Sequence, residues 1–148
     1  AQVERLAQLV AAAVGTARRM AQGVSGFVLH HGGLELALRE LAADCERRDG
    51  VECALRVVPE LARGLSDEQA YHLFRIAQEA TAGALRHAGA RRLAIALDGD
   101  AEGVRLAVVH DGGGAADGAR LAEARRLIGH RAGLLGAALR IRTDGVRE

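Results

Sequence analysis

The chain has 148 residues, 49% of them hydrophobic and only 2% aromatic, which is enough for one domain with an aliphatic core. Its 20 basic residues, all arginine, nearly balance 19 acidic ones, and a net charge of +1 argues against a nucleic-acid-binding surface. No apolar run near the N-terminus approaches the length that spans a membrane, so we expect a cytoplasmic protein without a membrane segment. The first residue is Ala1 rather than Met, which predicts a piece of a longer protein.

Residues 2–22 are predicted to form an amphipathic helix, because their apolar side chains recur at helical spacing. Such a helix covers its apolar stripe either on the rest of the domain or by pairing with a second copy, which predicts a homodimer. The glycines between residues 23 and 33 predict a turn or an irregular link. The apolar stripe consists of Val3, Leu6, Val10, Ala13, Val14, Ala17 and Met20 or Ala21.

The central part of the chain predicts helix, strand and helix in turn. Leu34–Arg48 has a helical pattern that the Asp49-Gly50 pair should end, and Val51–Val58 alternates like a strand that Pro59 stops. Ser66 followed three residues later by Gln69 is a capping box, which opens a long helix reaching about His87.

The remainder predicts a hairpin, a helix and a last strand. Strands at 92–97 and 104–109, joined by the polar residues 98–103, predict an antiparallel hairpin. Residues 116–135 favour a helix weakly, and 138–143 alternate as a final strand. Helices that alternate with hairpin strands indicate an α/β fold, most naturally a two-layer sandwich.

The two cysteines, Cys45 and Cys53, lack the spacing of a zinc site. We therefore expect buried free thiols and no metal held by cysteine.

Several segments, in the right order, resemble one protein family. Residues 73–88 resemble the N box of sensor histidine kinases; they read Leu-Phe-Arg-Ile-Ala-Gln-Glu-Ala-Thr-Ala-Gly-Ala-Leu-Arg-His-Ala. Residues 108–114, which read Val-Val-His-Asp-Gly-Gly-Gly, are similar to the G1 box of the same kinases. Residues 131–141 resemble the closing segment, 33–42 the helix after the dimerisation region, and 17–24 the end of the second dimerisation helix. The resemblance implies a dimerisation-helix end and linker at 1–32 and, at 33–148, the ATP-binding sandwich shared with gyrase-type and Hsp90-type ATPases.

The N box implies a phosphate-facing surface on one helix face. Gly83 stands where the family has the Asn that binds magnesium, and a glycine offers no oxygen ligand from its side chain. Glu79 matches the family's acidic position, which makes it the catalytic candidate, and Arg86 and His87 match positions that contact phosphate. From the residues alone, the same face reads as a solvated polar surface opposite a core stripe.

The G1 box implies the adenine-binding end of the site. Aligning its glycines puts His110 where the family has the Asp that accepts the adenine amino group; a slip of one residue would give that role to Asp111. Gly112 and Gly114 match the glycines of the loop. The G2 box is absent, because residues 118–127 favour a helix and lack the glycines whose amides cradle phosphates.

These departures predict a degenerate nucleotide site. The resemblance implies ATP and Mg²⁺ as cofactors, and no histidine within residues 1–22 could serve as phosphoacceptor. We expect the C-terminal module of a sensor histidine kinase or close relative, in two-component signal transduction, with weak or no nucleotide binding. One alternative is an active ATP–Mg²⁺-binding kinase domain with substitute ligands. A second is a non-catalytic dimerisation and docking scaffold for a response regulator or another signalling protein. A third is a phosphotransfer protein that relays phosphate through histidine, against which the lack of a histidine in residues 1–22 argues.

Overall fold

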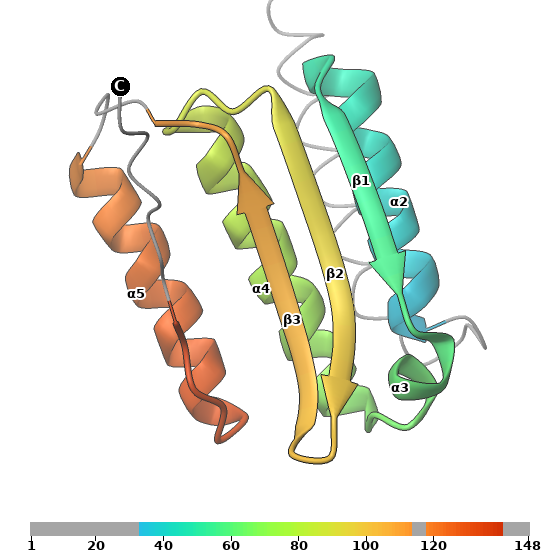
Figure 1. Ribbon diagram of the computed structural model, residues 1–148. Coiled ribbons are helices and arrows are strands. Elements are labelled where there is room, and N and C mark those ends of the chain that lie inside the picture. The colour runs from blue at the N-terminus through green and yellow to red at the C-terminus, as the bar shows by residue number, and fades with distance from the viewer. Residues whose placement is uncertain (1–32, 114–117, 141–148) are drawn as a thin grey trace, which may run out of the picture.

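The computed structural model describes residues 33–113 and 118–140, which form a mixed α/β fold with helices packed on a small sheet (Figure 1). The predicted helix at 2–22 and the link at 23–32 lie outside the described residues. In chain order the elements are α2 (Gly33–Asp49), β1 (Glu52–Val57), α3 (Pro59–Arg63), α4 (Asp67–Arg86), β2 (Arg92–Asp100), β3 (Gly103–His110) and α5 (Gly118–Leu134).

The three strands form one mixed sheet in the order β1-β2-β3. β1 pairs with β2 in parallel, with Cys53 opposite Leu93, and the connection between them carries α3 and α4. β2 pairs with β3 as the predicted antiparallel hairpin, with Ile95 opposite Val108. Along β2, burial alternates, so that Leu93, Ile95 and Leu97 face the helices and the residues between them face the other way.

Local sequence signals account for the ends of the two long helices. The side-chain oxygen of Ser66 accepts a hydrogen bond from the Gln69 N–H at 3.1 Å, and Gln69 Oε1 accepts one from the Ser66 N–H at 3.0 Å. This reciprocal capping box confirms the predicted start of α4. α2 ends before Gly50, whose φ of 63° is the left-handed conformation that favours glycine.

The core lies between the sheet and the helices α2 and α4, which lie side by side behind the strands in Figure 1. On α4 the side chains of Ala70, Ala77, Thr81 and Ala84 are buried. The buried Thr81 hydroxyl donates to the Ala77 carbonyl at 2.9 Å, so its polarity is satisfied within the helix. α5 packs against α4 at the side of this core.

Three details differ from the sequence-based expectations. Pro59, expected to stop a strand, also opens the short helix α3, because proline suits the first helical turn. The predicted six-residue connection of the hairpin is wrong: the strands continue to Asp100 and Gly103 around a two-residue turn. The predicted last strand is not formed over residues 138–140, and its remainder lies outside the described residues.

The two cysteines have the environment expected from the sequence. Cys45 on α2 and Cys53 on β1 are free and buried in the core. No helix in the described ranges combines the length and the apolar character needed to cross a membrane.

Candidate functional site

The N-box residues occupy the second half of α4, and their side chains have different environments. The Glu79 carboxylate lies 4.0 Å from the Arg75 guanidinium one turn earlier, and both side chains are about one third exposed. Arg86 is exposed at the last turn, and His87 is the half-buried C-cap, whose N–H donates to the Gly83 carbonyl. The helix therefore keeps Glu79 and Arg86 in contact with solvent and buries Gly83 between them.

Gly83 faces helix α5. A Cβ built on Gly83 would lie 3.8 Å from the Cβ of Ala124, an ordinary van der Waals contact. A longer side chain at position 83 would therefore meet α5, because the two helices approach closely at a pair of small residues. Ala124 belongs to residues 118–127, which were predicted to form a helix in place of a G2 box and lie within α5.

The G1-box residues follow β3 and bond to their own neighbourhood. Asp111 Oδ1 accepts hydrogen bonds from the backbone N–H groups of Arg91 and Arg92, at 2.8 and 3.0 Å. These two bonds lower the pKa of the Asp111 carboxyl, because they stabilise its charged form. His110 Nδ1 accepts a hydrogen bond from the Gly112 N–H at 3.1 Å. One carboxylate oxygen of Asp111, Oδ1, and the Nδ1 atom of His110 thus already accept hydrogen bonds from backbone N–H groups.

The structure brings the end of the N box and the start of the G1 loop together at Gly112. A Cβ on Gly112 would lie 2.5 Å from the Ala88 carbonyl oxygen, closer than a real Cβ can approach. Glycine is therefore required at this position by a backbone contact. At Gly113 a Cβ would meet nothing within 4 Å, and Gly114 lies outside the described residues.

This arrangement does not fit an ATP–Mg²⁺ complex held in the manner of the family. Gly83 supplies no oxygen ligand and Ala124 takes up the space beside it, while the Asp111 carboxylate serves the start of β2. Within residues 33–113 and 118–140, no three His, Cys, Asp or Glu side chains gather as a metal site.

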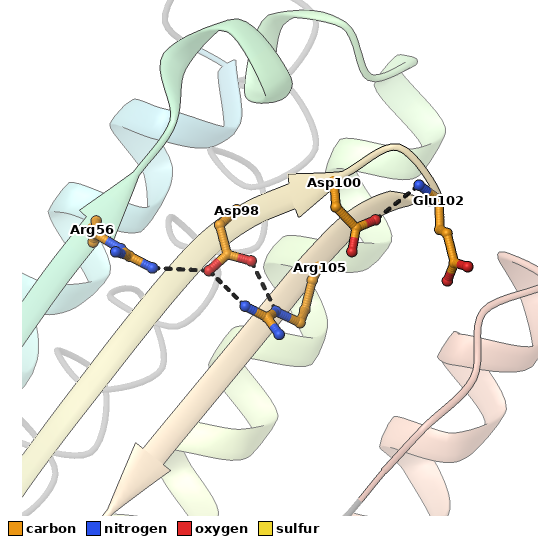
Figure 2. A network of polar contacts seen from close by, with 5 residues as sticks. All are labelled: Arg56, Asp98, Asp100, Glu102 and Arg105. Atoms are coloured by element: carbon orange, nitrogen blue, oxygen red, sulfur yellow. Dashed lines mark hydrogen bonds and ion pairs between the residues drawn. The ribbon is translucent and has the colours of Figure 1, made fainter.

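A second polar site, which sequence reasoning missed, lies on the outer face of the sheet beside the hairpin. Figure 2 shows Asp98 of β2 between two guanidinium groups, those of Arg56 on β1 and Arg105 on β3. Asp98 accepts from Arg56 at 3.0 Å and from Arg105 at 2.8 and 3.1 Å. The Arg105 hydrogen bonds are the main reason why the pKa of Asp98 is lowered. Only the strand register brings these three residues together, so no local motif signals the site.

These residues border a shallow hollow of about 450 Å³ that also includes the hairpin turn. Asp98 is shared between two arginines whose side chains are 74% and 73% exposed, so water screens the network strongly. The turn adds Asp100, whose carboxylate accepts the Glu102 N–H at 2.8 Å. The network joins side chains of all three strands.

Comparison with known proteins adds no assignment: no protein-family model matches the chain, and no curated protein matches it either.

Proposed function

We propose that this chain is a signalling module derived from a sensor histidine kinase, which has lost nucleotide binding and acts by docking other proteins. The contact between Gly83 and Ala124 carries the proposal. The N-box helix of such a kinase offers an Asn to magnesium, whereas α4 has a glycine at that position and a second helix packed over it. The family assignment rests on the resemblance of the N-box and G1 segments, with which a mixed α/β fold is consistent.

The alternative, an active kinase domain with substitute ligands, would need Glu79 or Asp111 to replace the missing groups. Glu79 is ion-paired with Arg75 on its own helix, and Asp111 accepts two backbone hydrogen bonds at the start of β2. Releasing Asp111 would leave two N–H groups without their acceptor, which costs about 1–3 kcal/mol for a buried donor and less at a wet surface. The observed bonds therefore argue against Glu79 and Asp111 as substitute ligands.

Calorimetric titration with ATP tests the proposal directly. We expect no heat of binding at millimolar ATP, with or without Mg²⁺, from the unaltered chain. Binding that requires Mg²⁺ would overturn the proposal and favour the active kinase domain. Control titrations with Mg²⁺ alone and with ADP alone separate binding of the metal from binding of the nucleotide.

Two variants test whether α5 is what closes the site. Gly83→Asn alone should lower the free energy of unfolding by about 1–3 kcal/mol, because the larger side chain meets Ala124. Gly83→Asn combined with Ala124→Gly should recover part of this loss, because the second change makes room. Equal stability of the single variant and the unaltered chain would show that α5 does not restrict position 83.

The proposed homodimer through residues 2–22 stays a prediction. Leu6→Glu with Val10→Glu puts two charges on the predicted apolar stripe and should shift a dimer toward monomer in analytical sedimentation. An unchanged sedimentation coefficient would argue that the stripe covers its own domain instead. A receiver domain of a response regulator, added as the second component in the same runs, tests the partner class.

A further inference from the structure

α5 exposes two leucines beside the face that it packs on α4. Ala124 approaches Gly83 of α4 and Ala132 is buried, whereas Leu127 and Leu134 are 46% and 57% exposed. Positions seven apart on a helix share a face, so these two leucines stand in line, about 10 Å apart along the axis. In Figure 1, α5 flanks α4 at the edge of the described fold. The two leucine side chains are therefore exposed to solvent on the same side of α5, two helical turns apart.

Charged residues flank this line in a definite pattern. With Leu127 and Leu134 as the first positions of successive heptads, His130 lies between them, and Arg126 and Arg131 occupy the two flanking positions. His130 and Arg126 are exposed and Arg131 is half-buried. Over its whole length α5 carries four arginines against one acidic residue, Glu123. We call Arg126, Leu127, His130, Arg131 and Leu134 the outer seam of α5.

We propose that the outer seam docks an acidic amphipathic helix of another protein. The leucines would enter an apolar stripe on that helix, and glutamates at its flanking positions would face Arg126 and Arg131. Flanking charges choose the partner in paired helices, since opposite charges steer association and like charges oppose it. This inference rests on the surface of α5 and holds whether or not the nucleotide site is closed.

Charge favours this partner over a second copy of the chain. Two outer seams that packed together in parallel would set Arg126 against Arg131, and in antiparallel they would set each arginine against itself. Both arrangements place like charges side by side, which destabilises the pair. The apolar line also distinguishes the surface from a nucleic-acid footprint, which consists of basic and polar groups. A membrane surface is disfavoured because the seam has only two apolar side chains, Leu127 and Leu134, a narrower apolar face than helices bury at a lipid interface.

A fluorescence-anisotropy titration of the full chain tests the proposal. The probe is a labelled helical peptide of about three heptads, with leucine at the core positions and glutamate at the flanking ones. We expect saturable binding that weakens with added salt. Leu127→Ser with Leu134→Ser should weaken it about tenfold or more, since apolar anchors supply most of the affinity in such contacts.

Charge exchange makes the test specific. Arg126→Glu with Arg131→Glu should abolish binding of the glutamate peptide and create binding of the same peptide with lysine at the flanking positions. The matched control is Leu36→Ser with Arg48→Glu on α2, which replaces a leucine 41% exposed and an exposed arginine, and should leave binding unchanged. Circular dichroism confirms that each variant keeps its helices.

Four outcomes would overturn the proposal. The first is that the outer-seam variants bind the glutamate peptide as tightly as the unaltered chain does. The second is that the α2 control loses as much affinity for this peptide as the outer-seam variants. The third is self-association, seen by sedimentation and abolished by the leucine variant, which would assign the seam to a second copy. The fourth is that the chain binds phosphatidylserine vesicles or a single-stranded oligonucleotide at concentrations at which the glutamate peptide shows no binding.

Discussion

Gly112 lies against the backbone of Ala88, so that the exit from β3 and the end of α4 touch without an intervening side chain. The same loop is held a second time, because Asp111 accepts the N–H groups of Arg91 and Arg92 at the entry to β2. These contacts tie together the two segments that carry the family resemblance. The backbone contact explains why position 112 is a glycine, and the two hydrogen bonds explain why position 111 is an aspartate, without a role for either residue in ligand binding.

Gly112→Ala should destabilise the fold. The new Cβ would lie 2.5 Å from the Ala88 carbonyl oxygen and 2.9 Å from the Ala88 Cβ, so the backbone has to move. We expect a loss of about 1–3 kcal/mol in the free energy of unfolding, measured by urea denaturation. Gly113→Ala is the control, because its Cβ would meet nothing within 4 Å, and it should stay within about 0.5 kcal/mol. Equal losses in the two variants would contradict the contact.

Two leucines on α2 provide a matched test of the core. Leu38 is fully buried at 0% exposure, whereas Leu36, two residues earlier on the same helix, is 41% exposed. Leu38→Ala should cost about 2–5 kcal/mol, because it removes apolar contacts and leaves a cavity. Leu36→Ala should cost less than about 1 kcal/mol. Thermal unfolding of both variants measures the two losses of stability. A larger loss for Leu36→Ala than for Leu38→Ala would mean that α2 is rotated from its described position.

Asp111 should make stability depend on pH on the acid side. Its folded-state pKa is lowered by the N–H groups of Arg91 and Arg92, so its contribution is complete above the unfolded pKa of about 3.9 and is lost as pH falls toward the folded value. Asp111→Asn removes the charge that titrates. The variant should therefore be less stable at neutral pH and should approach the unaltered chain below about pH 4. Parallel stability curves at all pH values would refute this role.

The buried cysteines should resist thiol reagents until the chain unfolds. Burial raises the pKa of Cys53 to about 11 and also raises the pKa of Cys45, so little thiolate is present at pH 8. Reaction with a disulfide reagent should be at least about a hundredfold slower in the native protein than in urea, since the thiolate is the reactive form. Cys45→Ser and Cys53→Ser report each thiol by itself. Native labelling as fast as in urea would contradict the burial.

Sequence reasoning succeeded where the signal is local. Ser66 and Gln69 lie within one turn and their capping box is confirmed, and the alternation over Val51–Val58 correctly predicted the strand β1. It failed where a contact depends on segments that are far apart in the sequence. Asp98 finds Arg56 only through the parallel register, and Gly83 meets Ala124 only because α5 packs on α4. The hairpin turn was predicted too long because the backbone pairing continues beyond the apolar residues, from Asp98–Arg105 to Asp100–Gly103.

The parallel pairing of β1 with β2 bears on how the chain reaches its fold. β2 and β3 are joined by a two-residue turn and can associate within microseconds, whereas β1 meets β2 only across residues 58–91, which must first collapse into α3 and α4. We therefore expect refolding to begin at the hairpin, with β1 added last. In pulse-labelled hydrogen exchange the amides of β3 would gain protection before those of β1, and the reverse order would place the nucleus on the helical side.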